Sequence, residues 1–163
     1  MDTVRRSDRG IKDMAEILTI IKKCDVCRLA LCEDNVPYMV PMSYGFEHTD
    51  NKLTLYFHCA KEGKKLDIIS RNPVAWFEMD CSHRMIEGTD PCGYTMEYEC
   101  VMGCGRISFC TEKSEKITAL TYLMKTYAGD RNFIFSDAEL DSVAVFRLEA
   151  SEFSAKRLKK VGR

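Results

Sequence analysis

The sequence has no long apolar segment, no surplus of one charge and no apolar leader. No run of apolar residues approaches the roughly 20 that span a bilayer. The 24 lysines and arginines balance 25 aspartates and glutamates, whereas a general nucleic-acid-binding protein or a polybasic membrane protein carries an excess of positive charge. Residues 1–9 are charged and lack the apolar segment of a signal peptide. We therefore expect a cytoplasmic protein that binds neither nucleic acid nor membranes.

Several common catalytic motifs are also missing. The sequence has no G-x-G-x-x-G between a strand and a helix, no Walker motif and no G-x-S-x-G, which argues against the common nucleotide-binding and hydrolase folds. Acidic residues are scattered, and no carboxylate pair indicates acid–base catalysis. With 163 residues, 45% of them hydrophobic, the chain can bury a self-sufficient core. No linker or repeat divides it, so residues 1–163 are interpreted as one domain.

Nine cysteines are many for this length, and an odd number cannot pair completely. In a cytoplasmic protein they are expected to be reduced. The motif Cys24-x-x-Cys27, with Cys100 and Cys104 farther on, raises zinc binding or a redox dithiol as hypotheses. A structural zinc site usually needs two close ligand pairs or a set of cysteines and histidines, and the second pair here is spaced more widely in strand-like sequence. We therefore expect structural thiols and no bound metal.

The spacing of apolar residues predicts short strands and a few helices. Ser7 or Asp8 can cap an amphipathic helix that carries Ile11 to Ile21. Strands are predicted at 26–32, 38–46, 53–59, 74–79, 94–110 and 142–148, the last with a continuation through 153, helices at 63–70 and 114–127, and a loop at 81–93. Gly103 and Gly105 mark a bulge or turn in the long strand. These elements favour a small closed antiparallel barrel flanked by helices.

A strand that runs into a lysine-rich turn is the most informative segment for function. His58 lies near the end of the strand, and Gly63, Lys64 and Lys65 follow where a helix opens. Free N–H groups at a helix start, beside two lysines, form a good phosphate cradle. The alternative is a solvated turn and a histidine that only packs in the structure. From spacing alone, that plainer interpretation is the favoured one.

A proline within a predicted strand marks a second candidate segment. Pro41 lies in 37–44 and cannot donate a ladder hydrogen bond, so it requires an edge strand, a bulge or a strand switch. Such an irregularity leaves neighbouring backbone groups free to bind the polar edge of a planar heterocycle. Prolines at barrel edges are common, so this segment is weak support for a site by itself.

Three motifs in this order resemble a known family. They are Val4-Arg5-Arg6-Ser7-Asp8-Arg9, Pro37-Tyr38-Met39-Val40-Pro41-Met42-Ser43-Tyr44 and Tyr56-Phe57-His58-Cys59-Ala60-x-x-Gly63-Lys64-Lys65. Together they closely resemble the 5-nitroimidazole-resistance (Nim-type) proteins of the pyridoxamine-phosphate-oxidase-like, FMN-binding split-barrel superfamily. The match continues through Tyr98-Glu99-Cys100-Val101, Gly105-Arg106 and the helix that begins at Ser114. It covers about 5–156, nearly the whole chain.

The resemblance implies a mainly β fold with flanking helices, an antiparallel split β-barrel of Greek-key type. It also implies a homodimer with two flavin sites at the subunit interface. The cofactor-binding residues carried over from the family are Val40, Pro41, Met42, Ser43, His58, Cys59, Ala60, Lys64, Lys65, Tyr98 and Cys100.

The same resemblance gives these residues roles. The segment 40–43 would line the isoalloxazine ring through backbone and side-chain contacts, while 58–60 would follow the flavin and its ribityl chain. Lys64 and Lys65 would face the phosphate, and Tyr98 and Cys100 would close the site from one subunit or its partner. Cys59 and Cys100 stand where the family more often has small hydroxyl residues, and a thiol is a weaker donor. Trp76 is interpreted as a core or interface residue.

The leading functional hypothesis is an FMN-binding oxidoreductase of the nitroimidazole-reductase type with a small-molecule substrate and a reduced electron donor. His58 is the candidate catalytic residue, and FAD is an alternative cofactor. A second hypothesis is a flavin- or haem-binding module that acts as a carrier or sensor without efficient turnover. Pyridoxamine-phosphate oxidation ranks third, because the superfamily is much wider than that activity.

Overall fold

A computed structural model describes residues 6–159 of the chain. The predicted domain therefore extends at both ends beyond the described residues, and Val4 and Arg5 of the first family motif lie outside them. The helices are α1 (Met14–Lys23), α2 (Lys64–Arg71), α3 (Lys113–Ala128) and α4 (Asp137–Ser142), with 3-10 turns η1 (Ser7–Arg9) and η2 (Pro91–Gly93). The strands are β1 (Gly10–Ile11), β2 (Cys27–Glu33), β3 (Val36–Met42), β4 (Gly45–Thr49), β5 (Lys52–Cys59), β6 (Val74–Ile86), β7 (Thr95–Phe109) and β8 (Ala144–Leu158).

The strands form one antiparallel sheet in the order β3-β2-β6-β7-β8-β5-β4, and β1 adds to β8. β6, β7 and β8 are neighbours in the sheet, although α3 and α4 lie between β7 and β8 in the chain. β5 leads to β6 through α2 but pairs with β8. This is a Greek-key connection. The described sheet ends at β3 on one side and β4 on the other and does not close. The split barrel is thus confirmed, and the fully closed barrel predicted from strand lengths is wrong.

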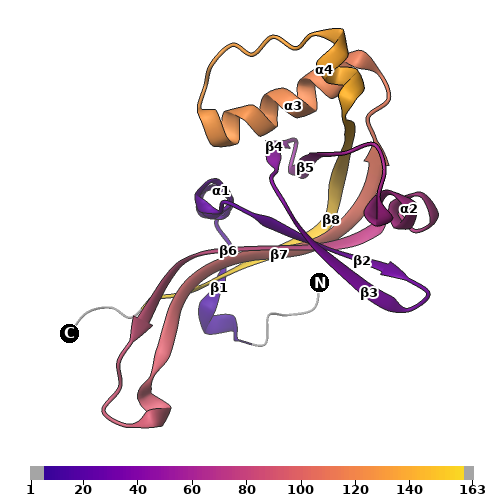
Figure 1. Ribbon diagram of the computed structural model, residues 1–163. Helices are drawn as coiled ribbons and strands as arrows, with labels where there is room; N and C mark the ends of the chain where they lie inside the picture. The colour runs from indigo at the N-terminus through magenta and orange to yellow at the C-terminus, as the bar shows by residue number, and fades with distance from the viewer. Residues whose placement is uncertain (1–5, 160–163) are drawn as a thin grey trace.

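Two groups of buried side chains hold the layers together. The larger group joins the sheet to α1 and α2, and its aromatic rings include Phe57 and Phe146, stacked with centroids 5.2 Å apart. The smaller group contains Tyr56, Leu120 and Val145 and joins β5 and β8 to α3 and α4. Figure 1 shows α3 and α4 together at one end of the molecule. The two faces of β5 therefore pack against different parts of the protein.

The first helix begins later than the sequence predicts. Gly10 and Ile11 pair with β8 as strand β1 instead of entering a helix. Asp13 is the N-cap of α1, and its side chain accepts a hydrogen bond from the Ala15 N–H at 3.1 Å. The prediction that Ser7 or Asp8 caps this helix is wrong, because pairing with a distant strand overrides the local helical spacing of Ile11.

The predicted strand 38–46 is two strands. β3 ends at Met42, Ser43 and Tyr44 form a break, and β4 begins at Gly45. The chain crosses here from the β2 side of the sheet to the β5 side. The expectation that Pro41 lies at an edge or strand switch is confirmed, because β3 is an edge strand that ends one residue later.

Three other boundaries differ from the prediction. β6 runs to Ile86 through a register shift between Cys81 and Arg84, so the first part of the predicted loop 81–93 is strand. β8 continues beyond 153 to Leu158, and α4 was not predicted. Both extensions depend on pairing with β7, which local sequence cannot specify. The predicted irregularity near Gly103 and Gly105 is confirmed as a register shift between Cys104 and Gly105.

The far halves of β6 and β7 form an arm that leaves the rest of the fold (Figure 1). The helices of the described chain are too short or too polar to span a membrane.

Candidate functional site

The lysine-rich turn connects β5 to α2 and is built around one glycine. Gly63 has φ of +137°, in the region that favours glycine, and a Cβ placed there would meet open space. Gly63 is also the N-cap of α2, whose first N–H groups lack helical acceptors. Lys64 and Lys65 are the first two helical residues. The turn thus presents free backbone donors and two cations at an open surface, which suits an anion.

Lys64 links this turn to the edge strand β3. Its Nζ lies 5.1 Å from the centroid of the Tyr38 ring, within the range of a cation–π contact. The structure therefore brings the second family motif, on β3, beside the third, on β5 and α2. These two segments are far apart in sequence, and the sequence pattern alone did not place them together.

His58 lies near the end of β5, half-buried and on the same face as Tyr56. Its Nδ1 is buried and has no hydrogen-bond partner among the described residues. Burial lowers the pKa of the imidazole below its ordinary value of 6.5. The ring is thus neutral at pH 7. A neutral imidazole has one N–H donor and one acceptor nitrogen, so His58 can donate a hydrogen bond but carries no positive charge and no acidic proton.

The adjacent residues of the turn differ in exposure. Burial raises the pKa of the Cys59 thiol, and nearby Lys65 opposes that shift. Ala60 is exposed and leads into the turn. The thiol of Cys59 is therefore protonated at neutral pH, and it is the weak donor that the sequence comparison anticipates.

The segment 40–43 alternates between the core and the surface. Met42 belongs to the core and Val40 packs against it, so their side chains point away from solvent. Pro41 and Ser43 are exposed on the opposite face. Side-chain contacts to a ligand can therefore come from Pro41 and Ser43, whereas Val40 and Met42 have only their backbone to offer.

Tyr98 and Cys100 lie at the other end of the molecule's longest strands. Cys100 pairs with Lys156 of β8. His58 pairs with Val145 of β8, and the next residue of β8, Phe146, pairs with Phe109 of β7. Phe109 is nine residues beyond Cys100 on β7, a distance of about 30 Å along an extended strand. One protomer therefore does not bring Tyr98 and Cys100 to the lysine-rich turn.

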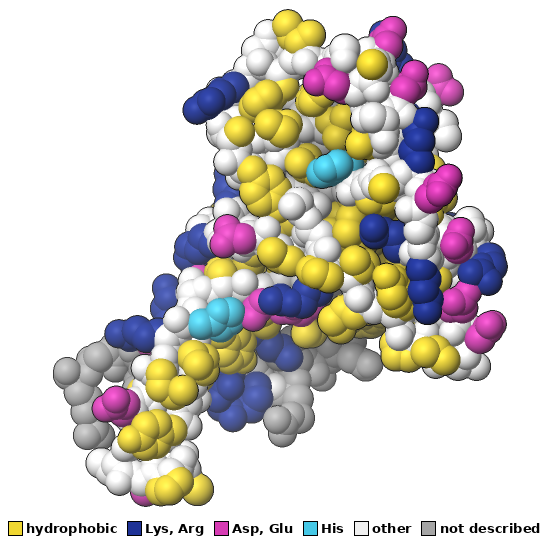
Figure 2. All heavy atoms as spheres, in the orientation of Figure 1, with side chains coloured by type: hydrophobic (Ala, Val, Ile, Leu, Met, Phe, Trp, Pro, Cys, Tyr) yellow, Lys and Arg dark blue, Asp and Glu magenta, His cyan; other side chains and the backbone are white. Residues whose placement is uncertain are grey.

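The outer face of the sheet carries exposed apolar side chains. Met39, Ala30, Trp76 and Cys104 lie in one row across β3, β2, β6 and β7. Met39 is 65% and Trp76 51% exposed, so Trp76 is not a core residue. The view in Figure 2 shows hydrophobic side chains gathered over the middle of one face of the molecule. Soluble monomers rarely leave such a surface uncovered.

The cysteine motif is part of the core. Cys24 and Cys27 are buried, and desolvation raises the pKa of both thiols. All nine cysteines are free. Residues 6–159 contain no group of three or more histidine, cysteine or acidic side chains that could hold a metal ion. The buried thiols of Cys24 and Cys27 therefore pack as small apolar groups in the core.

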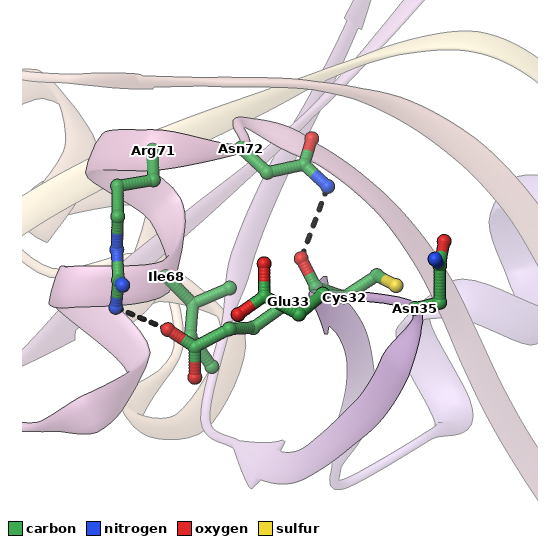
Figure 3. Close-up of a pocket in the computed structure, with 7 residues that line it drawn as sticks. Cys32, Glu33, Asn35, Ile68, Arg71 and Asn72 are labelled. Carbon is green, nitrogen blue, oxygen red and sulfur yellow. Dashed lines mark hydrogen bonds and ion pairs between the residues drawn. The ribbon is translucent and has the colours of Figure 1, made fainter.

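A polar notch beside α2 was not foreseen from the sequence. It has a volume of about 400 Å³ and lies between the β2–β3 turn and the end of α2. Arg71 forms an ion pair with Glu33 across it, and the Asn72 side chain donates to the Cys32 carbonyl at 3.0 Å (Figure 3). This ion pair and this hydrogen bond fasten α2 to the sheet.

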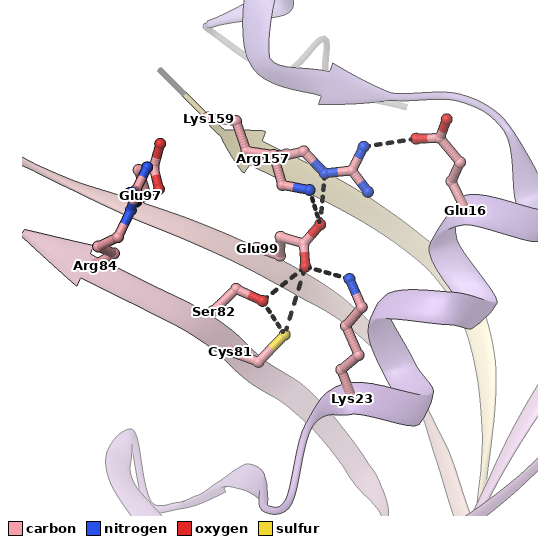
Figure 4. Close-up of polar contacts among 9 residues, drawn as sticks. All are labelled: Glu16, Lys23, Cys81, Ser82, Arg84, Glu97, Glu99, Arg157 and Lys159. Carbon is pink, nitrogen blue, oxygen red and sulfur yellow. Dashed lines mark hydrogen bonds and ion pairs between the residues drawn. The ribbon is translucent and has the colours of Figure 1, made fainter. Parts of the chain in front are cut away.

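A buried carboxylate at the base of the arm was also missed. The side chain of Glu99 is 1% exposed and accepts hydrogen bonds from Lys23 at 2.8 Å, Ser82 at 2.8 Å and Arg157 at 2.6 Å (Figure 4). Burial alone raises the pKa of Glu99, but these donors outweigh burial and lower it to about 2. Its partners come from α1, the β6 irregularity and β8. The cluster therefore ties three elements together.

Known proteins share the fold and part of the sequence. The family model for pyridoxamine 5'-phosphate oxidase matches residues 13–157. A structure from Bacteroides thetaiotaomicron, provisionally described as a 5-nitroimidazole antibiotic resistance protein, is 30% identical, with 91% of this chain and 86% of that chain covered and a TM-score of 0.78. No curated protein matches the sequence.

Two more distant structures share the fold. The flavocytochrome Anf3 from Azotobacter vinelandii is 16% identical, with 96% and 73% of the two chains covered and a TM-score of 0.78. An FAD and haem binding protein from Mycobacterium smegmatis is 13% identical, with 95% and 76% covered and a TM-score of 0.79. At these identities the likeness concerns the fold alone.

Proposed function

Because the chain belongs to the pyridoxamine 5'-phosphate oxidase family and resembles its 5-nitroimidazole-resistance members, we propose that it is an FMN-binding oxidoreductase of the nitroimidazole-reductase type. The observation that carries this proposal is the turn at Gly63, where free helix N–H groups and two lysines lie beside β3. FMN ends in a phosphate and FAD in a diphosphate-linked nucleotide. The single open turn suits the terminal phosphate of FMN best.

The residues present fit a flavin. Lys64, Lys65 and the first N–H groups of α2 would hold the phosphate, and the exposed edge at Pro41 and Ser43 would meet the ring. The unpartnered Nδ1 of His58 is a buried polar atom that a bound molecule could satisfy. Distant structures with the same fold are described as an FAD-binding protein from Mesorhizobium loti and an FAD and haem binding protein from Mycobacterium smegmatis, which agrees with a flavin site.

The proposal includes a homodimer with two sites at the interface. Tyr98 and Cys100 are too far along β7 to reach the turn of their own protomer, and a second copy could bring them there. The row that contains Met39 and Trp76 offers the apolar surface such an interface needs. The two observations are independent, and both favour a shared site.

When bound, the flavin supplies the electron or hydride transfer. The protein binds it, orients it and limits the water around it. His58 lies near the end of β5 as a neutral imidazole, which could donate a hydrogen bond to the nitro group as negative charge develops on it.

Turnover of the purified protein tests the activity. After reconstitution with FMN, we expect oxidation of a reduced nicotinamide to depend on an added nitroimidazole. A protein that holds flavin but shows no such turnover would be a carrier or sensor. A Soret band on addition of haem would favour the haem-binding alternative, which two of the distant structures motivate.

A further inference from the structure

The peptide between Ser43 and Tyr44 is held by a tyrosine from a distant helix. The Tyr127 hydroxyl, on α3, accepts a hydrogen bond from the Tyr44 N–H at 3.0 Å. The same hydroxyl donates to the Asp25 carbonyl at 2.8 Å. The two tyrosine rings meet edge to face, with centroids 6.5 Å apart. Tyr127 therefore fixes this peptide, with both the donor and the acceptor capacity of its hydroxyl in use.

The neighbouring residues leave the peptide little freedom. The Tyr44 ring is fully buried, and its hydroxyl lies 2.5 Å from the Ile21 carbonyl and 3.0 Å from the Cys24 carbonyl at the end of α1. A Cβ on Gly45 would lie 2.3 Å from the backbone nitrogen of Leu123, so α3 packs directly on the chain. The break between β3 and β4 is thus held from both α1 and α3.

The fixed peptide has a chemical consequence for Ser43. Peptide bonds among the described residues are trans, so the Ser43 carbonyl points opposite to the Tyr44 N–H, and hence away from Tyr127. Ser43 itself is exposed. The carbonyl is therefore a rigid acceptor aimed away from α3 at the end of the segment proposed to meet the ring.

We infer that Tyr127 is a positioning residue, which holds the Ser43 carbonyl as the acceptor for the imide N–H of the flavin ring. This inference rests on the proposed flavin function. The oxidised isoalloxazine ring has one such N–H, at N3, and a rigid acceptor can discriminate between a flavin that carries it and one that does not.

The test compares FMN with N3-methyl-FMN, which lacks the donor. Dissociation constants are measured for the full-length wild type, Tyr127→Phe and Tyr122→Phe. Tyr122 is a matched control, because it also lies on α3 but stacks on Tyr56, with centroids 5.3 Å apart, and nearby Glu47 raises the pKa of its hydroxyl. Each substitution removes one hydroxyl and keeps the ring, and of the two hydroxyls it is that of Tyr127 that bonds to the Tyr44 N–H.

We expect the wild type and Tyr122→Phe to bind N3-methyl-FMN at least about fivefold more weakly than FMN, the range of one net hydrogen bond. In Tyr127→Phe the ratio should fall below about twofold, because a released peptide can turn away from the methyl group. An unchanged ratio in Tyr127→Phe, or no discrimination by the wild type, would overturn the inference while flavin binding stands. A wild type that binds neither flavin would overturn the proposed function as well.

Discussion

Lys64 and Lys65 begin α2 immediately after Gly63, and neither is held in an ion pair with another described residue. Their charge is therefore available to a ligand at the open turn. His58 is the nearest histidine in sequence, and its Nδ1 is a second group without a partner. At the scale of single residues, the site therefore contains two lysines without an ion pair and a buried histidine nitrogen without a hydrogen bond among the described residues. Leaving a buried polar atom unpaired lowers the stability of the fold.

The double change Lys64→Ala and Lys65→Ala is expected to weaken FMN binding by orders of magnitude. Each lysine contributes a charge-assisted contact of about 1.5–3 kcal/mol to the phosphate. Visible absorbance after dialysis measures the remaining flavin. Lys22→Ala with Lys52→Ala is the control, because both lysines are exposed and lie outside the turn. Lys23 is unsuitable as a control because it bonds to Glu99.

If the Lys64 and Lys65 variant kept its full flavin content, the phosphate cradle would have to lie elsewhere. Arg106, exposed on β7, would then be the next candidate.

His58→Ala is expected to keep bound FMN but to reduce nitroaromatic substrates about 10²-fold more slowly, the cost of losing one hydrogen-bond donor to a developing negative charge. Stopped-flow oxidation of the pre-reduced proteins by metronidazole isolates this step from reduction of the flavin. Equal rates for wild type and variant would remove His58 from catalysis, and an altered flavin spectrum without a change in rate would make it a tuning residue.

At the scale of elements, helices and strands that are specified by their local sequence are predicted more accurately than strands that form by pairing with distant segments. β2, β5, α2 and α3 were predicted within a few residues, because each carries its own apolar period and its own end signals. β1 and the far end of β8 were not, since they exist by pairing with distant strands. The same distinction between local sequence and long-range contacts decides which parts of the site could be predicted. Gly63-Lys64-Lys65 could be recognised locally, whereas the role of Tyr127 depends on a contact between residues 83 positions apart.

Glu99 shows how one side chain can organise several elements. Glu99→Gln would leave Lys23, Arg157 and Lys159 together without their shared anion. We expect a loss of about 2–4 kcal/mol in the free energy of unfolding, somewhat less than for a fully buried pair because Lys23 is partly exposed. Urea unfolding at pH 7 measures it, with exposed Glu62→Gln as the control.

The acid dependence of stability provides a second check on Glu99. Its folded pKa of about 2 lies below the ordinary value of 4.5, so its contribution is present above pH 4.5 and is lost as the pH falls towards about 2. Wild type and Glu99→Gln should therefore converge in stability over that range. A constant difference down to pH 2 would contradict the assigned pKa.

At the scale of the whole molecule, the described chain is an open sheet with an apolar outer row and an arm of β6 and β7 that projects from the rest of the fold (Figure 1). The positions proposed for one flavin lie at both ends of the long strands. Both features are explained if the working unit is a dimer. The hydrophobic pattern of the sequence does not predict a dimer, which follows only from the family resemblance.

Trp76→Glu should convert the proposed dimer to a monomer, because it places a charge in the centre of the exposed apolar row. Light scattering at micromolar concentration gives the mass directly. Ile134→Glu is the matched control, since Ile134 is 88% exposed and lies in the loop between α3 and α4, away from that row. A wild-type protein that is monomeric would contradict the shared site.

The central claim is that this fold holds FMN at the turn before α2, and equilibrium dialysis of the purified protein against FMN tests it most directly. We expect saturable binding of one FMN per chain, which inorganic phosphate weakens by competition and which the Lys64→Ala and Lys65→Ala change weakens by orders of magnitude. Absence of saturable FMN binding by the wild-type protein would contradict this claim.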